Sequence, residues 1–326
     1  MRRHSLILLA LCAVFGIGLE LGVRYWLPRV GSVHPRWDRE RAEAEKIGPQ
    51  PSGPIQVLSV GNSLMQKGVN FPLLNQMLQP DYTAIRFVVE DTTYLDWYYG
   101  LRRLFREGAR PKVVVLVLNA RQLLAPNVEG DAFAELLMDG RDLLKVKQSV
   151  GSDNTVTSNL LAANLSLFYG VRTDVHKWVL LHVLPDFPDL TAKLRGSNPP
   201  LPDDSEIEEQ ATERLKKMAD LCAQYGAQFI FVVPPSTAAR DGSSAIQQAG
   251  IRTGVPVLVP IQPQEMPLDL YSDGFHLNYK GAKLFTHALS LSLRQALKKE
   301  SSVQSAESSQ AVRGSSLSLS ANPPSQ

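Results

Sequence analysis

The chain has 326 residues, of which 44% are hydrophobic, enough to fill the core of one large α/β domain or two small ones. Its 34 basic and 32 acidic residues are scattered without long runs and give a net charge of +2, which argues against binding to DNA or RNA. The two cysteines argue against a disulfide framework and a cysteine-based metal site. Cys222 lies in a predicted amphipathic helix, where a packing role is favoured over a thiol nucleophile.

The first residues are typical of a membrane-targeting element. A basic start is followed by an apolar run from Leu6 to Leu19, which resumes after Glu20 as far as Leu27. This run is about the ~20 residues that cross a bilayer, with arginines on its near side and aromatic residues at its far edge. Residues 1–28 are therefore predicted to anchor a domain on the outer, periplasmic or extracytoplasmic, side of a membrane. The alternative is the cleaved signal of a secreted protein, although the run lacks a convincing Ala-x-Ala site.

Residues 29–54 are polar and end in a proline-rich stretch, and we expect them to be a spacer between membrane and domain. The folded domain is predicted over residues 55–299. Its first strand is Ile55–Val60, a short apolar run that stops at Gly61. Further strands are predicted at Thr83–Val89, Lys112–Leu118, Phe229–Val233 and Val255–Val259.

Helical periodicity separates these strands. Helices are predicted at Phe71–Leu78, Tyr94–Arg106, from a capping box at Ser205 to Glu208, and from Asn278 to about Leu297. Residues from about 124 to 204 are predicted to be a helical insertion over the strand ends, either a lid or substrate wall or additional core packing. Residues 300–326 contain too few apolar side chains to be ordered, and a disordered tail is expected.

Strands that alternate with helices predict an open parallel sheet of five strands covered by helices on both faces. Ligands of such sheets bind at the carboxyl ends of the strands. Ser63 follows the first strand and Asn119 follows the third, so both are expected at that edge.

Two motifs at opposite ends of the domain carry the chemistry. Gly61-Asn62-Ser63-Leu64 supplies a hydroxyl, and Asp273-Gly-Phe-His276 supplies an imidazole beside a carboxylate. A serine is a poor nucleophile unless a base takes its proton; histidine is suited to that role, and an aspartate orients the histidine. Each motif alone is weak, because each is usually only a turn. Together, in the order Ser, Asp, His, they predict a serine hydrolase.

The two motifs give the chain a resemblance to the SGNH or GDSL hydrolase superfamily, over about residues 55–125 and 205–297. The resemblance implies a flavodoxin-like three-layer sandwich, with Ser63 as the nucleophile and Asp273 and His276 completing its triad. Asn62 stands where many members have Asp. Neither His-x-x-x-His nor a carboxylate cluster occurs, so no metal or other cofactor is expected.

The oxyanion hole is predicted less firmly than the triad. The backbone N–H of Ser63, at the start of a helix, is a natural donor. The glycine that the family places after the second strand is replaced by a loop in which Thr92 is the candidate. After the third strand, Asn119 is the candidate side-chain donor, with Arg121 as the alternative. A purely structural role, in which Asn119 only caps a helix or ends the strand, is the other interpretation.

Members of this superfamily with an amino-terminal anchor are similar to enzymes that add or remove O-acetyl groups on cell-surface polysaccharides. The resemblance therefore implies a membrane-anchored esterase or O-acyltransferase that acts on acyl, above all acetyl, esters of carbohydrate. Tyr94, Trp97, Tyr98 and Tyr99 are expected either to stack on a sugar ring or to belong to the core. The alternative function is a catalytically inactive relative that binds or assembles components for envelope polysaccharide export. The acyl group, the acceptor, and hydrolysis versus transfer stay open.

Overall fold

The structure, a computed structural model, describes residues 2–30, 33–49, 52–128, 133–172, 180, 183–184 and 200–317. Its centre is a sheet in the order β2-β1-β3-β4-β5, in which all neighbouring strands are parallel. The strands are β1 (Ile55–Gly61), β2 (Tyr82–Val88), β3 (Val113–Val117), β4 (Gln228–Val232) and β5 (Val257–Leu258). This is the strand order of the flavodoxin-like doubly wound fold, and it confirms the predicted fold class.

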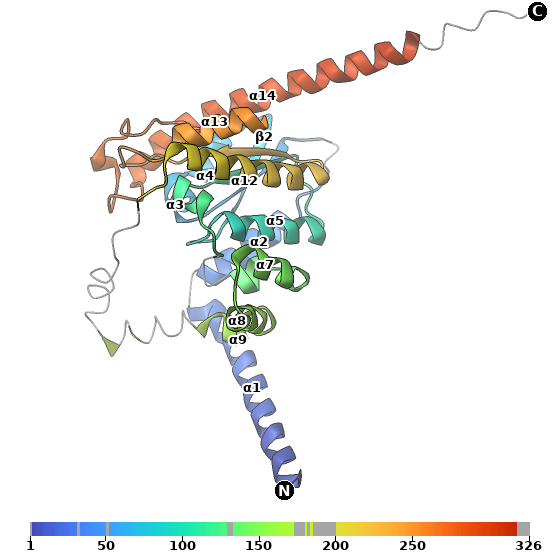
Figure 1. Cartoon of the computed structure of the whole chain (residues 1–326), viewed down its shortest axis with the longest axis vertical. Coiled ribbons are helices and arrows are strands. Elements are labelled where there is room, and N and C mark those ends of the chain that lie inside the picture. The colour runs from blue at the N-terminus through green and yellow to red at the C-terminus, as the bar shows by residue number, and fades with distance from the viewer. Residues whose placement is uncertain are drawn as a thin grey trace, which may run out of the picture.

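Helices cover both faces of the sheet (Figure 1). One face packs against α3 (Ser63–Gly68), α4 (Phe71–Leu78) and α14 (Tyr279–Leu317). The other face packs against α5 (Tyr94–Glu107), α6 (Ala120–Leu124), α12 (Asp204–Gln224) and α13 (Ser243–Thr253). Because both faces are covered, every residue of β3 is buried, as a continuous run of apolar residues predicts.

The caps of the long helices explain where they begin. Asn278 caps α14 as predicted, because its Oδ1 accepts the backbone N–H groups of Lys280 and Gly281. The predicted capping box at Ser205 is wrong: Asp203 caps α12 by accepting the N–H of Glu206. The last helix continues to Leu317, past its predicted end at Leu297, and residues 318–326 lie outside the described residues. A disordered tail from residue 300 stays a prediction.

The predicted spacer contains a packed helix, α2 (Val33–Glu45), that lies beside β2. Trp37 is buried in the core, and its Nε1 donates to Glu90 Oε2 at 2.8 Å. Glu40 is also buried and accepts the backbone N–H of Val88 at 2.9 Å. Arg36 forms an ion pair with Glu90 at 2.5 Å. Helix α2 therefore covers the outer edge strand of the sheet, whose free backbone groups would otherwise invite pairing with another chain.

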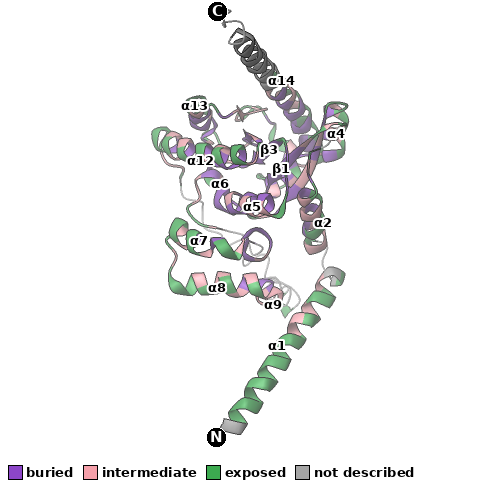
Figure 2. Cartoon of the chain, turned by 90° about the vertical axis from the view of Figure 1, so that its right-hand side faces the viewer, coloured by how far each residue is buried: buried purple, intermediate pink, exposed green. Residues whose placement is uncertain are grey.

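The described part of the insertion packs on the outer side of α5. It comprises a π-helical turn η1 (Phe133–Leu137), a 3₁₀ turn η2 (Gly140–Asp142), α7 (Leu143–Val150), α8 (Asn154–Leu165) and α9 (Leu167–Gly170). Figures 1 and 2 place these elements between the sheet domain and α1 (Arg2–Val30). These elements extend the hydrophobic core. This fits one of the two roles that the sequence left open for the insertion, additional core packing. Residues 129–132, 173–179, 181–182 and 185–199 of the insertion lie outside the described residues, and the interpretation of the insertion as a lid or substrate wall stays a prediction.

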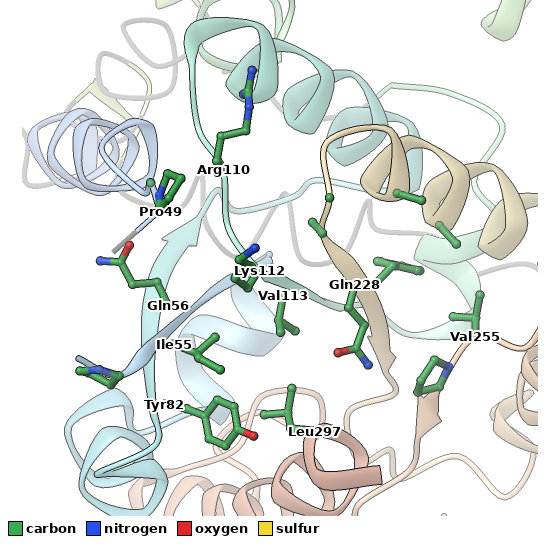
Figure 3. Close-up of a pocket in the computed structure, with 18 of the residues that line it drawn as sticks. Pro49, Ile55, Gln56, Tyr82, Arg110, Lys112, Val113, Gln228, Val255 and Leu297 are labelled. Atoms are coloured by element: carbon green, nitrogen blue, oxygen red, sulfur yellow. The ribbon is translucent and has the colours of Figure 1, made fainter. Parts of the chain in front are cut away.

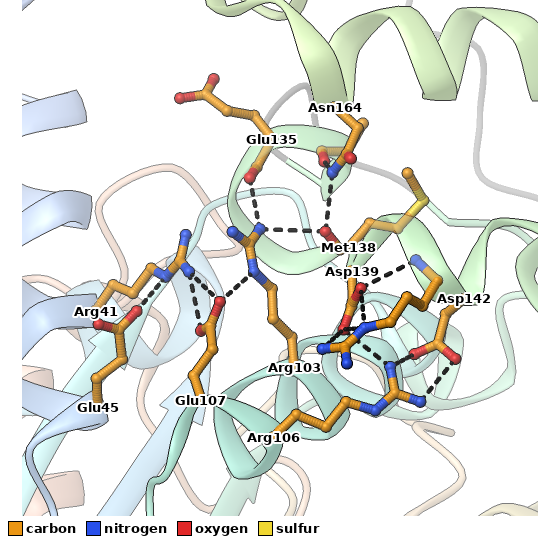
Figure 4. A network of polar contacts seen from close by, with 12 residues as sticks. Arg41, Glu45, Arg103, Arg106, Glu107, Glu135, Met138, Asp139, Asp142 and Asn164 are labelled. Carbon is orange, nitrogen blue, oxygen red and sulfur yellow. Dashed lines mark hydrogen bonds and ion pairs between the residues drawn. The ribbon is translucent and has the colours of Figure 1, made fainter.

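Arginines of α5 hold the insertion in place (Figure 4). Arg103 Nη1 donates to the backbone carbonyls of Glu135 at 2.7 Å and Met138 at 3.1 Å. Arg102 and Arg106 both bind the buried carboxylate of Asp142. Charge-assisted bonds to a buried carboxylate are among the stronger hydrogen bonds of proteins. They fix the insertion to α5 as one unit.

Candidate active site

The structure brings together three side chains from the two ends of the domain. Ser63 Oγ lies 3.0 Å from His276 Nε2, and His276 Nδ1 lies 2.7 Å from Asp273 Oδ2. Ser63 begins α3 two residues after the end of β1, and the other two lie in the loop before α14. These are the distances that a serine–histidine–aspartate relay requires.

Asn62 positions the serine. It is fully buried, and its Oδ1 accepts the N–H of Leu64 at 3.1 Å, which caps α3. Its Nδ2 donates to the carbonyl of Thr92 at 2.8 Å and so ties the serine turn to the loop after β2. The preceding Gly61 has no room for a side chain, since a Cβ there would lie 2.8 Å from the Val117 carbonyl oxygen. The backbone therefore turns sharply between two strand ends, with the hydroxyl at the sheet edge.

The Asp273–His276 loop is fixed by its own hydrogen bonds. Asp273 Oδ1 accepts the backbone N–H groups of Phe275 at 3.0 Å and His276 at 2.7 Å, which leaves Oδ2 for the imidazole. Ser272 donates its N–H to the His276 carbonyl at 2.8 Å and closes the turn. A three-residue spacing thus allows one carboxylate to hold both the loop and the ring.

These contacts define the direction of the hydrogen bonds. An ionised carboxylate only accepts, so Nδ1 of His276 carries the hydrogen and Nε2 is left to accept the Ser63 hydroxyl proton. The hydrogen bond from His276 and those from the loop backbone lower the pKa of Asp273 to about 2. Asp273 therefore stays charged at any pH near neutrality.

The candidate oxyanion donors have different surroundings. Ser63 is the first residue of α3, where backbone N–H groups lack intrahelical partners. Asn119 caps α6: its Oδ1 accepts the N–H of Gln122 at 3.0 Å, so its amide NH₂ is the end that can donate elsewhere. Asn119 also lines a small recess beside Leu64 and Phe275. Both the cap and the donor interpretation of Asn119 fit this position.

The other two candidates lie apart from that recess. Thr92 is fully buried; its hydroxyl donates to the Val89 carbonyl at 2.7 Å and accepts Trp97 Nε1 at 2.9 Å. Its carbonyl accepts the Asn62 side chain, so Thr92 supports the serine turn from inside the core. Arg121 is exposed on α6 and does not line the recess. Sequence reasoning missed the supporting role of Thr92, because only the fold shows that its hydroxyl meets Trp97 and its carbonyl meets the Asn62 amide.

An open hollow of about 580 Å³ lies on the other side of His276. Gln66, Asn70 and Asn278 line it together with the charged Lys67 and Asp273, and Tyr279 also lines it with 68% of its surface exposed. Tyr94, Trp97 and Tyr99 do not contribute to it, because all three are buried in the core. Of the two roles that the sequence left open for the aromatic cluster, core packing is the one found for these three residues.

Figure 3 shows a larger hollow, of about 880 Å³, at the opposite edge of the sheet, where the strands begin. Gln56 Oε1 and Gln228 Nε2 lie there, buried and without a hydrogen-bond partner among the described residues. The two side chains point in different directions in Figure 3 and do not converge on one ligand.

Within the described ranges, no group of three or more His, Cys, Asp or Glu side chains is placed to hold a metal ion. Cys222 is buried in the α12 core, and burial raises the pKa of its thiol to about 12. A thiol in that environment is a packing group rather than a nucleophile.

Comparisons with known proteins add little to this geometry. No family model and no curated protein matches the chain. Among solved structures, the crystal structure of TesA is similar over 74% of this chain and 98% of that chain, with a TM-score of 0.36 and 13% sequence identity. A likeness of this size carries no argument, so the fold rests on the strand order and the site on its own distances.

Proposed function

We propose that the protein is a membrane-anchored serine esterase or O-acyltransferase that acts on acyl esters, above all acetyl esters, of cell-surface carbohydrate. The observation that carries the proposal is the continuous hydrogen-bonded line from Ser63 Oγ through His276 to Asp273. The line lies at the carboxyl edge of a parallel sheet, where ligands of this architecture bind.

The reaction follows from the hydrogen-bond directions. Ser63 Oγ attacks the carbonyl carbon of the ester while Nε2 of His276 takes its proton, and Asp273 stabilises the resulting imidazolium. The tetrahedral intermediate collapses to an acyl-serine, and the leaving alcohol takes the proton back from His276. Water or a sugar hydroxyl then attacks the acyl-serine, with His276 acting again as the base. Water gives hydrolysis and a sugar hydroxyl gives transfer.

The oxyanion needs donors that point at the developing charge. We take the backbone N–H of Ser63 and the amide NH₂ of Asn119 as these donors, because Ser63 begins α3 and Asn119 lines the recess beside Leu64. Removal of one such donor costs roughly 10²–10³-fold in kcat in serine hydrolases. Asn119→Ala should therefore reduce turnover, whereas a role as a helix cap alone would reduce stability without that loss.

The hollow beside His276 supports a carbohydrate acceptor. The Gln66 amide and the NH₂ group of Asn70, whose oxygen caps α4, match the hydroxyl groups of a sugar, and the exposed Tyr279 ring can stack on its apolar face. Because His276 lines the hollow and its Nε2 lies 3.0 Å from Ser63 Oγ, a glycan bound there would bring an ester carbonyl carbon close to the serine.

Membrane anchoring is supported by helix α1. Its segment His4–Leu27 has the length and apolar character to cross a membrane, as either an anchor or a signal sequence would. Glu20 within it accepts hydrogen bonds from Ser166 Oγ at 2.9 Å and from the backbone N–H of Leu167 at 3.1 Å. Bonds between this helix and the folded insertion favour a retained anchor over a cleaved signal.

A fluorophosphonate probe tests the proposal, because it labels only an activated serine. The purified full-length chain in detergent should be labelled at Ser63, and Ser63→Ala should abolish labelling. Ser149→Ala, which removes a hydroxyl bonded to Tyr99 away from the site, should leave labelling unchanged. Screening against acetylated glycans, with mass spectrometry for acyl-Ser63, then identifies the acyl group. A folded wild-type chain that resists the probe would count heavily against an enzyme.

The inactive alternative makes opposite predictions. A binding or assembly component would hold polysaccharide equally well before and after Ser63→Ala and would not turn over p-nitrophenyl acetate. Hydrolysis that depends on His276 would exclude it.

A further inference from the structure

The insertion helices carry an apolar surface next to the anchor. Leu161 and Leu165 of α8 and Phe168 of α9 are exposed, and Leu165 exposes 72% of its surface. We call these three residues the α8–α9 apolar surface. The chain from Asn154 to Gly170 contains no Asp, Glu, Lys or Arg, although such residues make up 20% of the protein. A helical hairpin with one face in water would ordinarily carry charges there.

The other face of α8 is already occupied. Ala163 is buried, and Asn164 Nδ2 donates to the carbonyls of Ala134 at 2.6 Å and Met138 at 3.0 Å (Figure 4). The exposed apolar residues therefore do not belong to a face that packs within the described part of the chain. Their exposed surface is left for a partner outside the described part of the chain.

Helix α1 fixes the position of this surface relative to a bilayer. A helix rises about 1.5 Å per residue, so about 20 residues cross the ~30 Å hydrocarbon core. A span that begins at Ser5, next to the amino-terminal arginines, leaves the core near Arg24. The exposed rings of Tyr25 and Trp26 follow directly, where aromatic side chains gather at membrane interfaces.

Glu20 lies one helical turn inside that boundary and binds the insertion. Its carboxylate accepts Ser166 Oγ, the N–H of Leu167 and the N–H of Phe168 at 2.9–3.1 Å, and it pairs with Arg24 at 2.7 Å. A carboxylate at this depth is costly unless it is paired and hydrogen-bonded. These contacts hold the start of α9 against α1 about one helical turn, ~5 Å, inside the edge of the hydrocarbon core. Figures 1 and 2 show α9 beside α1.

We infer that the α8–α9 apolar surface is a second membrane contact, seated in the headgroup–acyl boundary of the outer leaflet beside α1. The inference rests on the proposed anchoring. Three apolar side chains and a run without charge fit the apolar side of that boundary, and the Glu20 contacts place them at the right depth. With α1 as one contact and this surface as another, the domain is held in a defined orientation above the membrane instead of turning freely on its anchor.

Site-specific fluorescence in vesicles tests this contact. In a Cys12→Ala background, Cys222 is buried and unreactive, so single cysteines can be labelled with an environment-sensitive dye. Leu165→Cys reports on the surface, and Leu9→Cys reports on α1. Ile251→Cys on α13 is the matched control, because it is equally exposed at 75% but lies on the sheet domain. Each full-length variant is reconstituted in phosphatidylcholine–phosphatidylglycerol vesicles with and without lipids that carry a quencher at acyl carbon 5.

The expected result is a blue-shifted emission and lipid quenching at Leu165, a similar response at Leu9, and neither at Ile251. A quenched dye at Leu9 with a water-like, unquenched dye at Leu165 would overturn the second contact and leave the anchor intact. An unquenched dye at Leu9 would overturn the anchor and the contact together. A shielded dye at Leu165 that lipids do not quench would mean that protein, such as a second copy of the chain, covers the surface instead. Unfolding transitions that match the parent show that each variant is folded.

Discussion

The buried amide of Asn62 offers a sharp test of how the serine turn is held. One end of this side chain accepts the Leu64 N–H, and the other donates to the Thr92 carbonyl at 2.8 Å. In Asn62→Asp the first bond persists, but the second carboxylate oxygen faces a carbonyl oxygen and cannot donate. Two acceptors then lie in contact in a site that excludes water.

The free-energy cost can be worked from these contacts. A buried acceptor left without a donor lowers the free energy of unfolding by about 1–3 kcal/mol, and burial of the carboxylate charge lowers it further. The stronger hydrogen bond from the Leu64 N–H to the charged oxygen offsets about 1 kcal/mol of this loss. We expect a net loss of about 2–4 kcal/mol at pH 8. At about 1.36 kcal/mol per unit, this raises the pKa of the introduced carboxyl by roughly 1.5–3 units above its ordinary value. Protonation restores a donor, so the loss should be roughly 1–3 kcal/mol smaller at pH 4.5 than at pH 8.

Chemical unfolding at the two pH values measures this loss. Tryptophan fluorescence is a suitable signal, because Trp97 donates to the Thr92 hydroxyl in the same loop. The matched control is Asn70→Asp: Asn70 caps α4 by accepting the Leu73 N–H, but its side chain is only half-buried, and Asp caps as well as Asn. It should change the free energy of unfolding little at either pH. Equal stability of Asn62→Asp and wild type at pH 8 would refute the donor role of the Asn62 amide.

Three further predictions concern the site and its supports. Asp273→Asn should lower kcat on p-nitrophenyl acetate by roughly 10³-fold, because an amide can donate to Nδ1 of His276 and leave the wrong tautomer facing the serine; unchanged kcat would contradict the assigned direction. Gly281→Ala should reduce activity and lower the melting temperature, since a Cβ there would clash with the Leu270 carbonyl oxygen and push the Asp273–His276 loop away; Gly48→Ala, where a Cβ would meet only the Lys46 carbonyl oxygen at 3.9 Å, is the control. Glu135 has its pKa raised to about 7, first by burial and then by nearby Asp38. Its ionised form therefore destabilises the fold increasingly from pH 4.5 to 7, and Glu135→Gln should raise the free energy of unfolding by about 2 kcal/mol at pH 8 and little at pH 4.5 in denaturant titrations.

Much of the site could be predicted because its geometry is set by local pattern and by the rules of parallel sheets. Apolar runs of five to seven residues between helical stretches identify the strands, and parallel strands place their carboxyl ends at one edge. That rule alone brings Ser63 and Asn119 to the same side. The three-residue spacing of Asp273 and His276 brings the carboxylate to the ring without help from the rest of the chain.

Other features of the chain did not follow from local pattern. The packed helix in the predicted spacer had a signal, since Trp37, Ala44 and Ile47 recur at helical spacing within a polar stretch. The supporting role of Thr92 had no such signal: its neighbours in the loop are equally polar, and only its contacts with Trp97 and Asn62 show that it holds the serine turn.

The sequence by itself determined the α/β alternation, the order of the hydroxyl, carboxylate and imidazole, and the membrane-length helix, because each depends on residues close together in the chain. The tertiary structure alone decided that the insertion packs on α5, that α2 covers the β2 edge, and that Glu20 meets the start of α9. These are contacts between segments far apart in sequence. The free energy of such a contact depends on how well the two surfaces fit and on which buried polar groups have no other hydrogen-bond partner in the fold. The pattern of residues along the chain does not contain that information.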